Sequence, residues 1–137
     1  MKLSSPTRPL SILVVDDVDE ICELVQHWLA AAGHNVKCAT SGNAARRLLE
    51  TQRFDVVVTD VLMPDGDGVE LIEACKAAEP TARIVAISGG GKYMDGGSCL
   101  KIARGFGADA AVPKPFTRQE LMAAIDLACS RSDAATS

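Results

Sequence analysis

The sequence predicts an α/β domain in which a parallel sheet carries helices on both faces. Short apolar segments alternate with segments of helical period five times along 137 residues. The apolar segments are nearly continuous, which is typical of strands that are covered on both sides. The connections are short, and such alternation favours parallel strands joined by right-handed crossovers. We expect one domain, because no internal repeat or long linker divides the chain.

Five apolar segments are expected to form the strands: 10–15, 35–39, 54–59, 82–87 and 108–112. The third segment contains Val56-Val57-Val58 and is the clearest buried strand. The second segment is more polar, so we place it at an edge of the sheet.

The remaining segments are expected to be helical. They lie at 19–32, 67–78, 98–105 and 117–130, and one more begins after Ser41, which can cap it. Gly33 is a natural end for the first helix. The first helix is expected to turn Ile21, Leu24, Val25, Trp28 and Leu29 toward the sheet. The third helix is expected to turn Leu71, Ile72 and Cys75 inward, and the last helix Leu121, Ile125 and Ala128. The ends at 1–9 and 131–137 are polar, so we expect flexible segments on either side of a domain spanning 10–130.

The composition excludes several classes of protein. The net charge is −4 and the Lys and Arg residues are not clustered, which argues against direct nucleic-acid binding. The five cysteines are widely spaced and unpaired, as expected for small buried residues in a reducing compartment. No apolar stretch approaches the ~20 residues that a membrane span needs. We therefore expect a cytoplasmic protein that does not contact a membrane.

Polar side chains follow four of the predicted strands. Asp16 and Asp17 follow the first strand, Asp60 the third, Ser88 the fourth and Lys114 the fifth. Ligands of open parallel sheets bind where the strands end at their carboxyl edge. Helix capping could explain any one of these residues, but not all five together.

The expected chemistry of this edge follows from its charges. Three neighbouring carboxylates repel one another, and a divalent cation resolves the repulsion. Mg²⁺ prefers hard oxygen ligands of this kind. A carboxylate beside Mg²⁺ can also accept a phosphoryl group, which makes Asp60 a candidate nucleophile. Lys114 and Ser88 would then bind the phosphoryl oxygens.

These residues carry a family resemblance. The chain has Val-Val-Asp-Asp at 14–17, Thr-Asp-Val-Leu-Met-Pro-Asp-Gly-Asp-Gly at 59–68, Ser88, and Lys-Pro-Phe at 114–116. In this order, each at a strand end, they resemble a bacterial response-regulator receiver domain of the single-domain, chemotaxis type. The resemblance covers residues 10–130. It implies a flavodoxin-like (βα)5 fold with strand order 2-1-3-4-5.

The resemblance also implies roles for the acids. Asp60 is the phosphorylated residue. Asp17 binds Mg²⁺ directly and Asp16 binds it largely through water. The backbone carbonyl of Leu62 is the remaining protein ligand.

Further roles and partners follow from the same resemblance. Ser88 is the switch hydroxyl, Lys114 pairs with the phosphoryl group or with Asp60, and the Lys114-Pro115 bond is commonly cis. A sensor histidine kinase or a histidine phosphotransfer protein donates the phosphoryl group. The signal passes to a downstream protein through the last two helices and the fifth strand, and a homodimer is possible.

Some positions depart from the family pattern. Ala111 stands where receivers usually carry Tyr or Phe, and the Gly-rich stretch 89–97 looks longer than in compact receivers, so we expect the switch to involve this loop and the helix after it. Leu62 and Gly90 stand where polar side chains usually orient an attacking water. We therefore predict slow self-dephosphorylation.

Two other functions fit the sequence less well. An aspartate-nucleophile, Mg²⁺-dependent phosphohydrolase would need a second Asp where the chain has Leu62. A degenerate receiver that acts only as a binding module would have lost an acid or Lys114, and none is lost. The receiver interpretation explains more of the sequence than either.

Overall fold

Five parallel strands form a single sheet in the computed structural model, which describes residues 9–61, 67–79, 81–88 and 107–136. The strand order is β2-β1-β3-β4-β5, so the predicted flavodoxin-like order is confirmed. The strands are Ser11–Val15 (β1), Asn35–Ala39 (β2), Val56–Asp60 (β3), Arg83–Ser88 (β4) and Ala110–Pro113 (β5).

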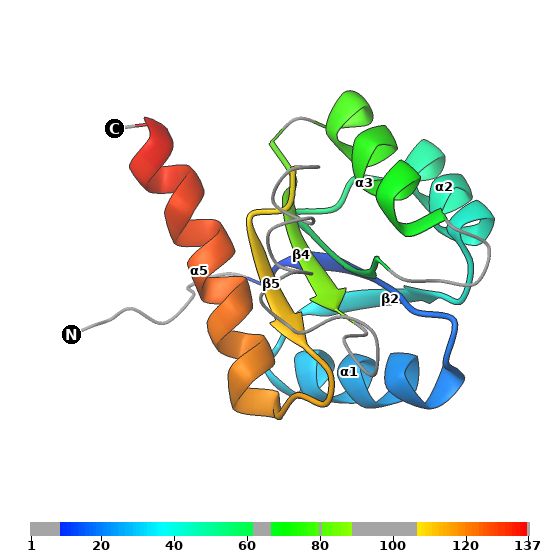
Figure 1. Ribbon diagram of the computed structural model, residues 1–137, viewed down its shortest axis with the longest axis vertical. Coiled ribbons are helices and arrows are strands. Elements are labelled where there is room, and N and C mark those ends of the chain that lie inside the picture. Colours follow the sequence, from blue (N-terminus) through cyan, green and yellow to red (C-terminus); the bar gives the residue numbers. More distant parts are fainter. Residues whose placement is uncertain (1–8, 62–66, 80, 89–106, 137) are drawn as a thin grey trace.

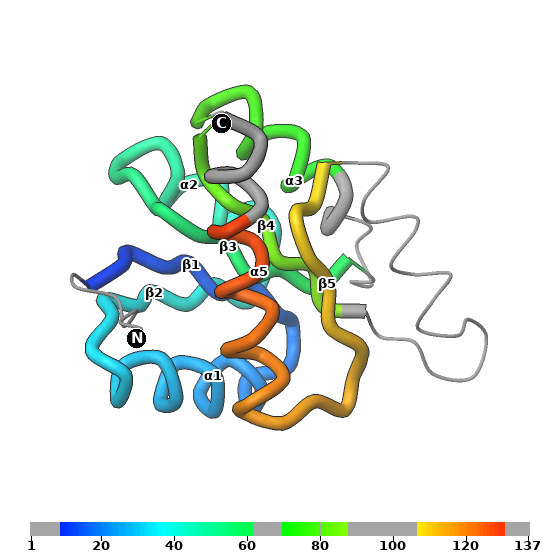
Figure 2. Tube along the Cα trace, turned by 90° about the vertical axis from the view of Figure 1, so that its left-hand side faces the viewer, coloured from blue at the N-terminus to red at the C-terminus, as the bar shows by residue number. Residues whose placement is uncertain are grey.

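The described helices cover both faces of this sheet. They are Asp19–Ala31 (α1), Gly42–Thr51 (α2), Asp67–Ala78 (α3) and Arg118–Thr136 (α5). In Figure 1, α1 and α5 lie on one side of the strands and α2 and α3 on the other. Figure 2, turned by 90°, again shows α1 on one side of the strands and α2 and α3 on the other. The Gly-rich stretch 89–97 and the helix predicted at 98–105 lie outside the described residues.

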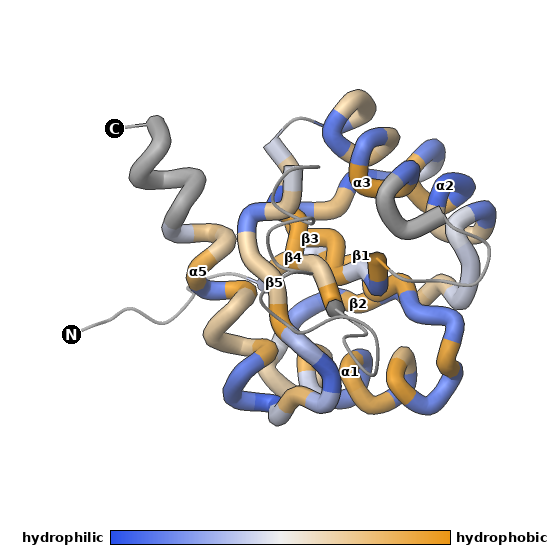
Figure 3. Tube along the Cα trace, viewed as in Figure 1, coloured by the Kyte–Doolittle hydropathy of each residue, from blue (hydrophilic) through white to orange (hydrophobic). Residues whose placement is uncertain are grey.

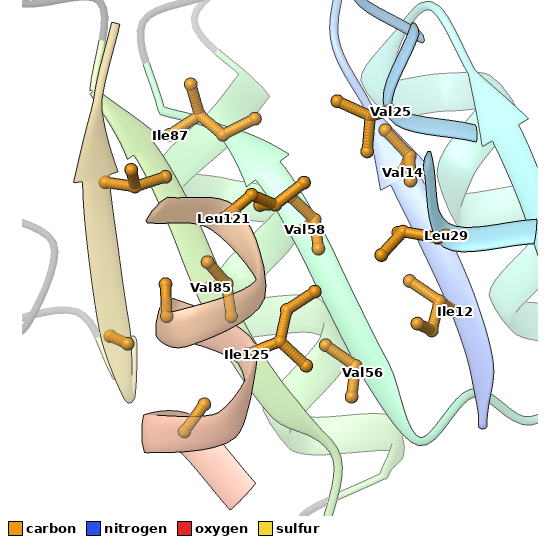
Figure 4. Close-up of a cluster of buried hydrophobic side chains, with 14 of the residues drawn as sticks. Ile12, Val14, Val25, Leu29, Val56, Val58, Val85, Ile87, Leu121 and Ile125 are labelled. Carbon is orange, nitrogen blue, oxygen red and sulfur yellow. The ribbon is translucent and has the colours of Figure 1, made fainter. Parts of the chain in front are cut away.

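Two apolar layers hold the helices to the sheet. Side chains alternate along each strand, so Ile12 and Val14 face α1 and α5 whereas Leu13 and Val15 face α2 and α3. Figure 3 shows hydrophobic segments in the central strands β3 and β4, whereas hydrophobic and hydrophilic segments alternate along α1. In Figure 4, Leu121 and Ile125 of α5 lie over β3 and β4. This packing anchors the start of α5 next to the carboxyl edge of the sheet.

The edge strands match the sequence. β2 is half-exposed along most of its length, as its polarity predicted. β5 is the other edge strand and ends at Pro113, and edge strands are where sheets tolerate proline. Ser41 Oγ accepts a hydrogen bond from Ala44 N–H at 3.1 Å, which confirms the predicted cap of α2. Gly33 follows α1 with φ of 97°, a conformation that favours glycine.

The predicted faces of α3 and α5 are confirmed, but one position of α1 was wrong. Leu24 is 43% exposed, and Cys22 is buried instead beside Val25 and Leu29. The apolar stripe of α1 is wider than the strip it buries, so periodicity alone did not give the rotation of the helix. Ile21 and Trp28 lie at its half-buried margin.

The predicted end of the last helix was also wrong. α5 continues to Thr136, six residues beyond the expected end at 130. The chain from 118 to 136 contains no Gly or Pro, so nothing in the sequence stops the helix.

Candidate functional site

The parallel register of the strands brings their carboxyl ends to one edge of the sheet. Val15 pairs with Thr59, Asp60 with Ile87, and Ser88 with Pro113. Asp16, Asp60 and Lys114 each lie at or one residue beyond the end of a strand. The sheet therefore brings to one edge the residues that the sequence predicted there.

Three carboxylates meet at this edge. Oxygens of Asp16, Asp17 and Asp60 all lie within 4.8 Å of one another. Asp16 and Asp60 are buried, with 0% and 3% of their surface exposed, while Asp17 is exposed. Burying two carboxylates is costly unless they are compensated by positive charge. The cluster is thus closed on its inner side and open to solvent at Asp17.

Lys114 supplies part of that compensation. Its Nζ lies 3.0 Å from Asp16 Oδ2 and donates a hydrogen bond to Asp60 Oδ2 at 3.1 Å. Burial alone would lower the pKa of Lys114, but the neighbouring carboxylates of Asp16 and Asp60 outweigh burial and raise it above its ordinary value of 10.5. Lys114 is therefore a cation at neutral pH. One ammonium against three carboxylates still leaves the site with excess negative charge.

The backbone holds Asp16 in place. Its Oδ1 accepts a hydrogen bond from Val18 N–H at 2.9 Å, and its own N–H donates to Ala39 O at 3.1 Å. Its buried Oδ2 lies 3.0 Å from the ammonium of Lys114, and no backbone N–H among the described residues donates to that oxygen. Such an oxygen, beside two more carboxylates, is what a hard divalent cation requires. The described residues therefore fit Mg²⁺.

One contributor was missed by the sequence analysis. The Cys22 thiol donates to Asp16 O at 3.3 Å and contacts Ala39 O at 3.6 Å, which ties α1 to the end of β1. Burial raises the pKa of Cys22 to about 12, so it stays a protonated donor. The expectation that the cysteines are buried is confirmed for Cys22 and Cys75, whereas Cys38 and Cys129 are half-buried. Nothing in the spacing of Cys22 signalled its contact with the site.

Two of the predicted site residues lie partly or wholly outside the described part of the chain. Ser88 is the last residue of β4, as expected, but its side chain lies outside the described part of the chain. Leu62, the predicted carbonyl ligand, lies outside the described residues altogether. The Lys114-Pro115 peptide is cis, as the resemblance implied.

Comparison with known proteins agrees with this geometry. Residues 12–126 match the response regulator receiver domain. The chain belongs to this family. Receiver domains of two-component response regulators are signalling domains phosphorylated on Asp, rather than enzymes in the usual sense, and they typically bind Mg²⁺ at an acidic pocket.

Similar curated proteins are longer than this receiver. The alkaline phosphatase synthesis transcriptional regulatory protein PhoP of Bacillus subtilis is 32% identical over 90% of this chain and 50% of its own length. Response regulator MprA of Mycolicibacterium vanbaalenii is 33% identical over 84% of this chain and 48% of its own length. The receiver thus spans about half the length of these relatives.

Similar solved structures include domains of the same size. Chemotaxis response regulator CheY4 of Vibrio cholerae has a TM-score of 0.76 and 27% identity over 86% of this chain and 97% of that one. A response regulator receiver domain protein from Clostridium thermocellum has a TM-score of 0.78 and 29% identity, over 91% and 98%. In the part of this receiver that the structure describes, no helix is long and apolar enough to cross a membrane.

Proposed function

We propose that Asp60 of this receiver accepts a phosphoryl group from the phosphohistidine of a sensor kinase or a histidine phosphotransfer protein. The observation that carries the proposal is the buried carboxylate of Asp60, which lies beside two more acids and 3.1 Å from Lys114 Nζ. This arrangement supports a charged, oriented nucleophile next to a cation site. Positioned charge of this kind is the main means by which proteins assist phosphoryl transfer.

Asp16, Asp17, Asp60 and the backbone carbonyl of Leu62 would hold the metal. When bound, Mg²⁺ supplies positive charge next to the transferred phosphoryl oxygens. It also offsets the repulsion among the acids, which Lys114 offsets only in part.

The transfer step uses residues of this chain in defined roles. A carboxylate oxygen of Asp60 attacks phosphorus, a P–O bond forms, and the P–N bond to the donor histidine breaks. The electron pair of that bond returns to the histidine nitrogen, which needs no oxidant or reductant. Lys114 binds a phosphoryl oxygen, and Ser88 donates its hydroxyl hydrogen to another. The donor ring carries a proton on its other nitrogen, so the products are an acyl phosphate on Asp60 and a neutral imidazole on the donor.

The output of this step is a signal. Phosphorylation favours one of two packings of the domain, since a modification shifts an equilibrium only through differential contacts. A downstream protein, or a second copy of the chain, would read the favoured packing, as in a single-domain regulator of the chemotaxis type. Two expectations from the sequence belong to the same proposal: a cytoplasmic location, and slow self-dephosphorylation because Leu62 and Gly90 cannot hydrogen-bond an attacking water.

The proposal is tested by incubating the chain with acetyl phosphate and Mg²⁺ and measuring its intact mass. One phosphoryl adduct is expected, and Asp60→Asn should abolish it. Asp126→Asn is the matched control, because it removes an exposed acid on α5 and should keep the adduct. No adduct on the unmodified chain would favour a binding-only module, and sustained release of phosphate from many esters would favour a hydrolase.

A further inference from the structure

The strand that leads into Lys114 lacks the aromatic ring that would report on the site. Ala111 of β5 is half-buried and packs against the apolar layer beneath α2 and α3. A methyl group has no alternative rotamer, so this position cannot switch by moving a ring. Among the described residues, the aromatic side chain closest along the chain to Lys114 is Phe116, two residues further on.

Phe116 touches a second ring that comes from another helix. Its ring lies edge-on to that of Trp28 on α1, with the centroids 6.2 Å apart and the planes at 67°. Both rings are half-buried at the margin of the layer beneath α1 and α5. Edge-to-face pairs are favourable but specific in geometry, so a small shift of either ring changes the contact. Half-buried rings also have room to move that close-packed core side chains lack.

Both members of this pair are connected to the acidic site. Phe116 is joined to Lys114 through Pro115 alone, whose ring restricts φ and so limits the slack between them. Trp28 lies on α1, which begins directly after the acids and is held to Asp16 by the Val18 N–H. The contact between the two rings therefore joins two segments that are each connected to the acidic site.

We propose that the Trp28–Phe116 contact responds to the phosphorylation state of Asp60 and takes the place of the ring missing at Ala111. This inference rests on the proposed function. Without the phosphoryl group, Lys114 lies between the carboxylates of Asp16 and Asp60, at 3.0 and 3.1 Å. Phosphorylation removes the negative charge of the Asp60 carboxylate and places new charge further out, on the phosphoryl oxygens. Lys114 follows that charge and carries Pro115 and Phe116 with it.

The chain that follows Phe116 is held in place, so a movement of Lys114 shifts the Phe116 ring rather than α5. Thr117 Oγ1 accepts a hydrogen bond from Glu120 N–H at 3.1 Å, and Thr117 N–H donates to Glu120 Oε1 at 2.8 Å. This reciprocal pair is a capping box, which holds the first turn of α5. Leu121 and Ile125 anchor the same helix in the core. Phe116 thus lies between Lys114, which moves with the phosphoryl charge, and α5, which stays in place.

The consequence appears on the surface between α1 and α5. A groove of about 450 Å³ lies there, and Trp28, Arg118 and Met122 are among its lining residues. Trp28 forms part of the wall of this groove and also contacts Phe116. A change in that contact on phosphorylation of Asp60 would therefore change the shape of the groove.

Trp28 is the single tryptophan of the chain, so its fluorescence reports this contact directly. The full chain is treated with Mg²⁺ alone or with Mg²⁺ and acetyl phosphate, and each sample is measured both by intact mass and by tryptophan emission. We expect a shift of the emission that grows with the phosphoryl adduct. Phe116→Leu should form the adduct and lose the shift. Phe54→Leu is the matched control, because Phe54 is buried just before the amino end of β3, away from the carboxyl ends that form the site, and this variant should keep both the adduct and the shift.

The outcomes separate the inference from the function on which it rests. An adduct without a shift, or a shift that persists in Phe116→Leu, overturns the inference and leaves the proposed function standing. Absence of any adduct overturns the proposed function and the inference with it. If circular dichroism shows that Phe116→Leu does not fold, the indole N–H resonance of Trp28 in the unmodified chain decides. An unchanged resonance on phosphorylation then overturns the inference.

Discussion

Replacing Lys114 by Met should destabilise the metal-free domain by about 3 kcal/mol. At 3.0 and 3.1 Å, each ion pair of Lys114 is worth about 5 kcal/mol of Coulomb energy at an effective dielectric constant of 20. Desolvation cancels much of this attraction, so the net effect comes from the two buried carboxylates left without a cation. Losing one partner of a buried pair costs about 3–5 kcal/mol, and we take the lower end because the Lys114 side chain is 22% exposed.

Urea unfolding followed by circular dichroism measures this cost. Lys76→Met is the matched control, since Lys76 pairs with Asp109 at 3.6 Å and both side chains are more exposed than those of Lys114, Asp16 and Asp60. It should cost less than about 1 kcal/mol. Saturating Mg²⁺ should recover part of the loss in Lys114→Met and none in Lys76→Met. An equal cost for the two variants would refute the electrostatic reasoning.

Three further predictions follow from the described residues. Asp17→Asn should raise the stability of the metal-free domain by about 0.5–1 kcal/mol, because it relieves repulsion at an exposed position, yet weaken Mg²⁺ binding in a calorimetric titration at least about tenfold; unchanged affinity would contradict the assignment of Asp17. Burial raises the pKa of Cys22 to about 12 and that of Cys75 to about 11, so a thiol reagent at pH 8 should label the half-exposed Cys38 and Cys129 before either of them. The stability that Cys22 contributes should be complete below pH 9 and should fall as the pH rises toward 12. Replacing Cys22 by Ala should remove that fall. Leu121→Ala should cost about 3–4 kcal/mol in urea unfolding because its side chain is fully buried, whereas Leu127→Ala, at 47% exposure, should cost less than about 1 kcal/mol; similar costs would show that α5 is not anchored as described.

The strand-end residues were predictable because two simple rules determine them. The apolar runs locate the strands, and the register of a parallel sheet brings their carboxyl ends to one edge. These two rules suffice to bring Asp16, Asp60 and Lys114 together. The polarity of β2 likewise placed it at an edge of the sheet.

Details that depend on rotation or on partners were not predictable in the same way. A helical stripe gives a face, but whether Cys22 or Leu24 lies at its buried centre depends on how α1 seats against β1. The contact of Trp28 with Phe116 joins residues 88 positions apart, and no local pattern signals it. The end of α5 was misjudged because a polar composition does not by itself stop a helix that lacks Gly and Pro.

The carboxylate of Asp60 is the group to which we assign the phosphoryl transfer, and one measurement tests that assignment directly. Borohydride reduces an acyl phosphate to an alcohol, so a phosphorylated Asp60 becomes homoserine at that position. After treatment with acetyl phosphate, Mg²⁺ and borohydride, peptide mass spectrometry should find this change at position 60 and at no other acid. Modification at Asp16 or Asp17 with Asp60 intact would contradict the account.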